Sequence, residues 1–182
     1  ADVIPATKDQ DVYVRRLALQ ALAALKDPQG VPAIEAALLD PENSVRCQAA
    51  DALASLHGPE SLSRVLQAVD EAGTFQFNFV AAQQALEAIG PDNLDALLAQ
   101  LESPNVNVRR TILRALQSLA GADRPALRPA LLEALQTDED PYARELALGA
   151  LTRYANDPEV VAAMLRALDD RDPVVQVRAA RY

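Results

Sequence analysis

Apolar residues along this chain recur with the spacing of one helix face, in blocks that repeat every few tens of residues. The clearest block is 40–56, DPENSVRCQAADALASL, which opens with an Asp-Pro turn. Its apolar positions fall on one side of an α-helix: Val45, Ala49, Ala52, Leu53 and Leu56. This block predicts a helix that buries a face of alanine and leucine and leaves the remaining positions in solvent.

The same pattern returns along the chain when Arg46 is taken as its anchor. Further copies have their anchors at Arg15, Phe79, Arg109, Arg144 and Arg178, in steps of 30–35 residues. Self-similarity at such a period is typical of a stack of like units, each contacting its neighbours, rather than of one globular fold. In every copy we expect the positions at anchor −1, +3, +6, +7 and +10 to be buried.

A second apolar stripe follows the first helix of each unit. Its positions are Val31, Ile34 and Leu38; Leu62, Val65, Leu66 and Val69; Leu94, Leu97, Leu98 and Leu101; Leu131, Leu132 and Leu135; and Val161, Met164, Leu165 and Leu168. Gly or Asn between the two helices supplies a left-handed cap, and Asp-Pro or Ser-Pro pairs between units cap the next helix. Each unit is therefore predicted to be a helical hairpin.

These hairpins predict an all-α, right-handed α-solenoid that forms a single array over residues 1–182. Its units are roughly 9–39, 40–72, 73–102, 103–137 and 138–170, with partial units at 1–8 and 171–182. Terminal units of solenoids normally carry a polar outer cap, which neither end shows. We therefore expect the chain to be a piece of a longer array.

The charge of the chain narrows the classes of partner. It carries 26 acidic against 17 basic residues, for a net charge of −9, and only two of the basic residues are lysines. Nucleic acids and anionic membranes are therefore not expected as partners, because both are bound through Lys and Arg. The first 91 residues hold 12 acidic and 6 basic side chains, and the last 91 hold 14 and 11. We expect a protein partner with a basic or neutral surface, more so toward the N-terminal half.

The absence of a long apolar run, of a signal peptide and of a second cysteine predicts a cytoplasmic protein. The one cysteine, Cys47, lies at anchor +1, a position of mixed composition, and is interpreted as an ordinary helix residue. His57 is the one histidine, and no nucleophile, orienting carboxylate or further metal ligand is visible beside it in the sequence. No catalytic residue, metal site or cofactor is predicted.

The pattern D-P-x-x-x-V-R-x-x-A-x-x-A-L, with a G-x-x-x-x-(V/L)-x-x-L-x-x-A-L second helix, resembles the short HEAT-like repeats of bacterial solenoid proteins. The same repeat is found in bilin-lyase subunits that handle phycobiliproteins. The signatures of tetratricopeptide and ankyrin repeats are missing. The resemblance implies that the motif arginine and the aspartate of the preceding turn form a ladder from unit to unit. It assigns a structural role to Arg15, Arg46, Arg109, Arg144 and Arg178.

The third unit departs from the pattern, because it lacks the Asp-Pro turn and the arginine and holds every phenylalanine of the chain, Phe75, Phe77 and Phe79. One interpretation is that aromatic bulk fills the space of the missing arginine. The other is that at least one ring faces outward as a binding anchor. Phe79 is expected to be at least half buried and Phe77 to be the most exposed. The candidate partner-binding residues are Phe75, Phe77, Arg64, Gln67 and Gln100.

The leading function is a protein–protein interaction scaffold that binds a partner on the concave face, which the second helices line. The alternative is an enzyme subunit resembling the bilin lyases. A lyase-like subunit is expected to change the absorbance of an added tetrapyrrole, whereas a scaffold is not.

Overall fold

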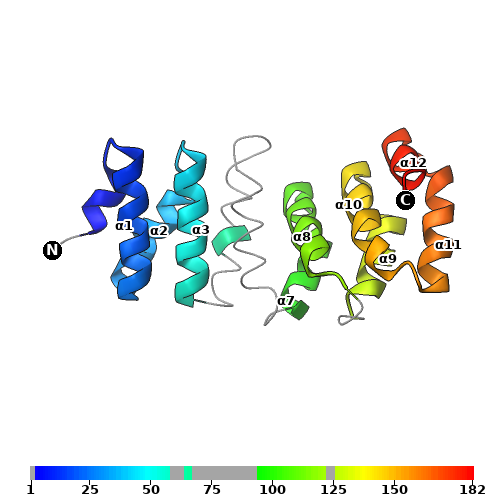
Figure 1. Ribbon diagram of the computed structural model, residues 1–182, viewed down its shortest axis with the longest axis horizontal. Coiled ribbons are helices and arrows are strands. Elements are labelled where there is room, and N and C mark those ends of the chain that lie inside the picture. Colours follow the sequence, from blue (N-terminus) through cyan, green and yellow to red (C-terminus); the bar gives the residue numbers. More distant parts are fainter. Residues whose placement is uncertain (1–2, 58–63, 67–93, 122–125) are drawn as a thin grey trace. The chain divides into compact units, whose positions relative to one another are not determined.

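The computed structural model describes residues 3–57, 64–66, 94–121 and 126–182, and every regular element in these ranges is a helix (Figure 1). The predicted all-α class is confirmed. The chain divides into two compact units, Ala1–Asn93 and Leu94–Tyr182. The boundaries predicted for the individual hairpins stay a prediction, since most of residues 58–93 lie outside the described ranges.

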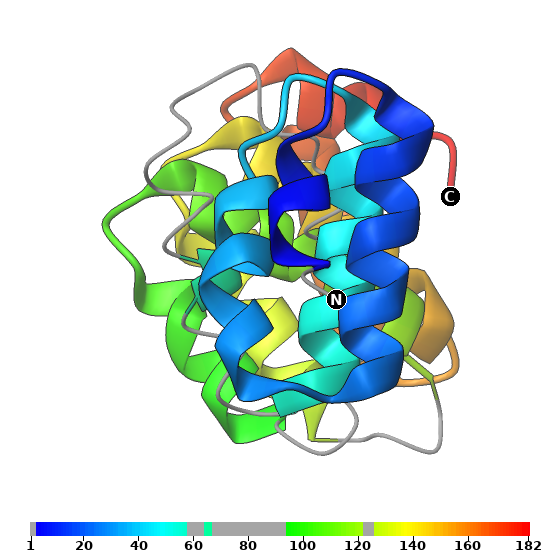
Figure 2. The same cartoon turned by 90° about the vertical axis from the view of Figure 1, so that its left-hand side faces the viewer.

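The described part of the N-terminal unit is one helical hairpin followed by the first helix of the next. It contains η1 (Ile4–Lys8), α1 (Val12–Leu25), η2 (Pro28–Gly30), α2 (Val31–Ala37) and α3 (Asn43–His57). Both α1 and α2 pack against α3, and Figure 2 shows α2 in a second layer beside α1. The first helices α1 and α3 thus stack on each other, and the second helix α2 packs against α3 in the other layer.

The C-terminal unit continues this arrangement. It contains α7 (Leu94–Ala99), η4 (Gln100–Glu102), α8 (Val106–Leu119), α9 (Leu127–Thr137), α10 (Pro141–Leu151), η5 (Thr152–Tyr154), α11 (Pro158–Arg166), η6 (Ala167–Asp169) and α12 (Pro173–Ala179). The first helix α10 contacts the first helices α8 and α12, and it also contacts α9, the second helix of the preceding hairpin. Within this unit α7 with η4, α9 and α11 are the second helices, and we call the surface they line the second-helix face.

Small residues let the first helices approach closely. In α3, α8 and α10 the alanines predicted at anchor +3 and +6 are buried, namely Ala49, Ala52, Ala115, Ala147 and Ala150. In α1 the prediction is only partly right, because Ala21 is half-buried and Leu25, at anchor +10, is 64% exposed. A side chain as short as alanine lets helix axes come close, while leucines one position on fill the space between layers. The predicted first-helix core is therefore found in α3, α8 and α10.

Carboxylate and amide side chains cap the helices. Asp140 and Asp172 are N-caps with proline at the next position, as predicted, and Asn105 caps α8. Asp40 and Ser103, also predicted as caps, instead lie two residues before the N-cap position. Their side-chain oxygens accept the N–H of the residue two positions on, so each shapes the turn rather than the helix end.

The predicted core of α11 is wrong by one residue in register. Val161, Leu165 and Leu168 were expected inside but are exposed by 40%, 60% and 41%. The structure buries Val160 and Ala163 instead, followed by Ala167 in η6. This helix is apolar nearly all round, so periodicity offers two stripes, and the one with smaller residues fits the close approach to the neighbouring helices.

Candidate functional site

One guanidinium connects the turns that open two consecutive units. Arg15 donates from Nε and Nη2 to the two carboxylate oxygens of Asp40, at 2.8 and 2.9 Å. Its Nη1 donates to the backbone carbonyls of Asp9 and Gln10, at 2.9 and 3.2 Å. The planar fork of arginine matches both sets of acceptors. Arg15 thus holds the turn before its own helix and the turn before the next unit.

The C-terminal unit repeats this geometry twice. Arg109 donates to both oxygens of Asp138 at 2.9 Å, and Arg144 donates to Asp170 at 3.0 and 2.7 Å. The resemblance placed the aspartate in the turn preceding the arginine. In the structure that turn supplies carbonyls, and the carboxylate comes from the following turn. The reason is that Nη1 points back along its own unit, which leaves the Nε–Nη2 edge facing the next one.

Each of these aspartates is also fixed by its own backbone. Asp40, Asp138 and Asp170 accept the N–H of the residue two positions on, at 2.8, 2.9 and 2.8 Å. Burial on its own raises the pKa of Asp170, but the bonds from Arg144 and from the backbone outweigh it, and the pKa lies below its usual range. The same bond to Asp170 raises the pKa of Arg144. Both partners therefore stay charged at neutral pH.

Arg46 forms the bonds to the turn before its own helix. Its Nη1 donates to the carbonyls of Asp40 and Pro41, at 2.6 and 2.8 Å. Its Nε is buried and has no hydrogen-bond acceptor among residues 3–57 and the other described ranges. The turn that would open the next unit lies outside the described residues.

Arg178 does not occupy the ladder position. It pairs with Glu145 at 2.5 Å and lies over the ring of Tyr182. Gln176 instead donates to the carbonyl of Asp170, six residues earlier, at 2.6 Å. Like Arg144 after its N-cap, Gln176 follows the N-cap of its helix by four residues. The ladder position is therefore defined by its distance in sequence from the N-cap and not by the Val-Arg motif.

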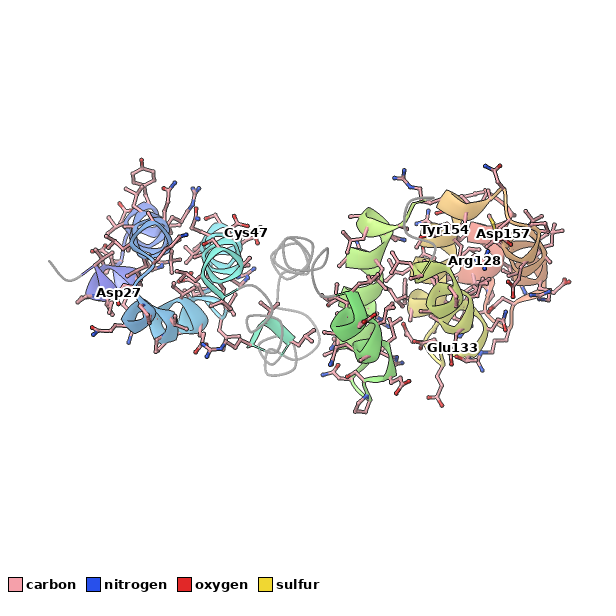
Figure 3. The ribbon with its side chains drawn as sticks, turned by 90° about the horizontal axis from the view of Figure 1, so that it is seen from below. Asp27, Cys47, Arg128, Glu133, Tyr154 and Asp157 are labelled. Carbon is pink, nitrogen blue, oxygen red and sulfur yellow. The ribbon has the colours of Figure 1, made fainter. Side chains whose placement is uncertain are left out.

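Two clefts open between consecutive second helices of the C-terminal unit. The larger has a volume of about 450 Å³ and lies between α7–η4 and α9, extending to residues 138 and 139. Leu98, Leu101 and Ala134 form its inner wall. The smaller, about 260 Å³, lies between α9 and α11. Glu133 lines both clefts, and Figure 3 shows it on α9, on the opposite side of the helices from Tyr154.

A family model for HEAT repeats matches residues 1–76 and 128–182. The chain belongs to the HEAT-repeat family. Among curated proteins no match to it is found. The predicted resemblance and the predicted solenoid class are both confirmed.

Solved structures similar to this HEAT-repeat chain have low sequence identity. The protein YibA of Escherichia coli is 16% identical, with 97% of this chain and 67% of that chain covered and a TM-score of 0.50. The archaeal HEAT-like repeats protein of Thermococcus onnurineus is 13% identical, with 98% and 83% covered and a TM-score of 0.49. The CpcE–CpcF complex of phycocyanin lyase from Nostoc is 23% identical, with 98% and 79% covered and a TM-score of 0.43. These likenesses concern the fold.

The predicted partner-binding residues are spread over the HEAT-repeat chain. Gln100 is half-buried on η4, next in sequence to two residues of the larger cleft. Arg64 forms an ion pair with Glu35 of α2. Phe75, Phe77 and Gln67 lie outside the described residues, as does Phe79. The two described candidates, Arg64 and Gln100, thus belong to different units.

Three ion pairs were not foreseen from the sequence. Arg110 donates to both oxygens of Asp140, at 2.8 and 2.5 Å. Arg128 pairs with Asp157, and Arg64 with Glu35. In each pair the two residues are 29 or 30 positions apart, close to the period of the repeat. A search for opposite charges one period apart would have found them.

The two side chains weighed for reactivity, Cys47 and His57, both belong to α3. Cys47 is half-buried on α3, and its Sγ lies 3.6 Å from Oδ1 of Asn43. Burial raises the pKa of the Cys47 thiol, so the unreactive protonated form dominates at neutral pH. His57 ends α3, and its side chain lies outside the described residues.

Two features are absent from the described residues. In those ranges no three His, Cys, Asp or Glu side chains gather in a way that could hold a metal ion. Nor is any helix there long and apolar enough to cross a membrane.

Proposed function

We propose that this HEAT-repeat chain is a protein–protein interaction scaffold that binds its partner through the second-helix face. The observation that carries the proposal is the pair of clefts on this face, which follow one another across α9. Grooves between the helices of a solenoid offer an extended surface that needs no catalytic group. In a solenoid this surface is the concave one.

The ladder arginines are proposed to be structural and not available to a partner. Arg15, Arg109 and Arg144 each place Nε, Nη1 and Nη2 on internal acceptors. A guanidinium whose donors are used inside the protein has little left to offer an external ligand. The basic residues that remain are outnumbered by the 26 acidic side chains, which disfavours a groove for nucleic acid.

The partner is proposed to present a basic or neutral surface, in keeping with the net charge of −9. Complementary charge speeds association and suppresses wrong partners. A cytoplasmic location is part of the proposal, because a single cysteine leaves no intrachain disulfide.

A photo-crosslinking side chain placed on each face of the protein tests the proposal. Gln136 lines the smaller cleft, whereas Arg114 is exposed on the first helix α8. In extract from the native source, the variant labelled at 136 is expected to capture a partner and the one labelled at 114 is not. Capture from 114 alone would contradict the proposal. A visible absorbance change on adding a tetrapyrrole would favour the bilin-lyase-like alternative.

A further inference from the structure

We propose that the larger cleft between α7–η4 and α9 binds an extended segment of the partner that carries Lys or Arg side chains. The inference rests on the proposed function and names the chemistry of the segment that the second-helix face would take. It is carried by three features of the cleft: unneutralised carboxylates at its rim, an apolar inner wall, and a size suited to a ligand.

The rim of the cleft carries negative charge that the protein leaves unneutralised. Glu102, Glu133 and Glu139 are exposed there, and within residues 94–121 and 126–182 none of their carboxylates forms an ion pair. Arg109, which also lines the cleft, is committed to Asp138. A cation that approaches the cleft therefore meets carboxylates that form no ion pair with an arginine of this unit.

The carboxylates of the turns make a contrast. Those of Asp138, Asp140, Asp157 and Asp170 are each paired with an arginine. In this unit, the acidic groups that hold the units together are neutralised, and those on the rim of the cleft are not. Charge complementarity therefore selects a basic occupant and disfavours an acidic peptide or a phosphate backbone.

The inner wall of the cleft suits the stem of a basic side chain. Leu98 and Leu101 are half-buried and Ala134 is buried. The methylenes of Lys or Arg lie well on such a surface while the charged head stays in the wet rim. A volume of about 450 Å³ falls inside the range of about 300–1,000 Å³ that is usual for ligand sites.

The smaller cleft extends the site by one helix. Glu133 lines both clefts, and Glu159 adds a further exposed carboxylate on the far side of α9. Packed helices are about 8–10 Å apart, and a chain in the extended polyproline II conformation advances about 3.1 Å per residue with three residues per turn. A segment that crosses the second helices in this conformation would therefore present basic side chains to the clefts at about every third residue.

The test uses the full chain and a fluorescein-labelled peptide with Lys at every third position between Ser and Leu residues, followed by fluorescence anisotropy. Glu133→Lys is expected to weaken binding about tenfold or more, because it sets like charges against each other in the cleft. Asp169→Lys makes the same change of charge at an exposed site outside the cleft, and is expected to weaken binding less than about twofold.

Equal weakening by both variants would mean attraction to the overall negative charge, and would overturn the inference. No binding of the Lys peptide to the wild-type chain, or equal binding of the peptide with Glu for Lys, would overturn it too. Glu139→Lys is a second cleft variant, to be used if the circular dichroism of Glu133→Lys shows lost helix. It is expected to weaken binding as Glu133→Lys does.

The cross-linking test separates this inference from the proposed function. If position 136 captures the partner equally well in the Glu133→Lys background, the scaffold function stands and the assignment of the cleft falls. If capture is lost with Glu133→Lys and kept with Asp169→Lys, both are supported. If the second-helix face captures nothing while the first-helix face does, the proposed function falls whatever the peptide does.

Discussion

At the scale of single residues, Arg144 shows what one side chain contributes to the array. Its side chain is 3% exposed, and it bonds Asp170 as well as the carbonyls of Asp138 and Glu139. Truncation would leave a partly buried carboxylate without its cation and two carbonyls without a donor. We expect Arg144→Ala to lower the free energy of unfolding by about 3 kcal/mol or more, measured by urea denaturation.

Arg114→Ala is the matched control for that measurement, since Arg114 is exposed on α8. It is expected to change the free energy of unfolding by less than about 0.5 kcal/mol. Equal effects of the two substitutions would show that the bonds of Arg144 add nothing beyond general charge. Arg144→Lys is expected to recover only part of the loss, because an ammonium lacks the planar fork.

The ladder side chain is the fourth residue after the helix N-cap. A sequence search that counts from the N-cap finds this position, whereas a search for the Val-Arg motif can miss it. Gln176 has the position of Arg144 relative to the cap but not its chemistry, so a search for Val-Arg selected Arg178 two residues later. Ser103 stands where other turns have aspartate, and the preceding anchor in sequence is Phe79. Arginine and carboxylate are thus absent together, which avoids leaving a charge without its partner.

At the scale of the helix, Gly149 in α10 marks a close contact between two first helices. A Cβ at this position would lie 2.5 Å from Nε2 of Gln117, which donates to the carbonyl of Leu146 and links α8 to α10. Alanine in a helix is favoured over glycine by about 0.5–1 kcal/mol, but here it would displace the glutamine. We expect Gly149→Ala to leave stability nearly unchanged, because the helix gain offsets a lost hydrogen bond of about 1 kcal/mol.

A double-mutant cycle tests that explanation. In a Gln117→Ala background the contact is gone, and Gly149→Ala is expected to raise the free energy of unfolding by about 0.5–1 kcal/mol. The interaction energy between the two positions is then about 0.5–1 kcal/mol. A cycle in which the two effects simply add would show that Gln117 does not limit the residue at 149.

Helical spacing predicted α3 and α8 well and α11 poorly, for a physical reason. In α3 and α8 polar residues separate the apolar positions, so a single stripe is possible. In α11 the run Val160, Val161, Ala162, Ala163, Met164 and Leu165 is apolar throughout. Choosing the larger residues placed Leu165 inside, whereas close helix approach buries the smaller ones. Sequence periodicity carries no information about that distance.

The register of α11 gives a direct measurement. Val160 is fully buried and Leu165 is 60% exposed. Val160→Ala is expected to cost about 2 kcal/mol of stability, through lost packing and a small cavity. Leu165→Gln is expected to stay within about 0.5 kcal/mol of the wild-type chain. The reverse ranking in thermal denaturation would restore the register predicted from the sequence.

At the scale of the whole molecule, the repeat period and the fold class follow from the sequence, but the clefts do not. The repeat can be predicted because the spacing of apolar residues within each block can be read directly from the sequence. The larger cleft needs Leu98 beside Ala134 and Glu102 beside Glu133, residues more than 30 positions apart. Only the offset between neighbouring hairpins brings these together. For that reason the predicted candidate Gln100 lies beside the larger cleft in sequence without lining it.

Stability of the array against acid follows from the carboxylates of its turns. In the C-terminal unit, the pKa values of Asp140, Asp157 and Asp170 lie below their usual range, because hydrogen bonds and arginines outweigh burial. A carboxyl group whose pKa is lower in the folded state than in the unfolded state contributes stability that is complete above the unfolded pKa, about 4. That contribution is lost as the pH falls through the folded pKa.

Acidification is therefore expected to weaken the C-terminal unit first. Burial raises the pKa of Asp51 in the N-terminal unit, and a raised pKa has the opposite sign, since protonation then relieves a cost of folding. Hydrogen exchange between pH 7 and about pH 3.5, corrected for intrinsic rates, is expected to show protection falling in α8–α12 before α1–α3.

Asp170→Asn removes one of the responsible carboxyl groups, so the urea midpoint of this variant should depend less on pH than that of the wild-type chain. An equal dependence would show that Asp170 does not contribute.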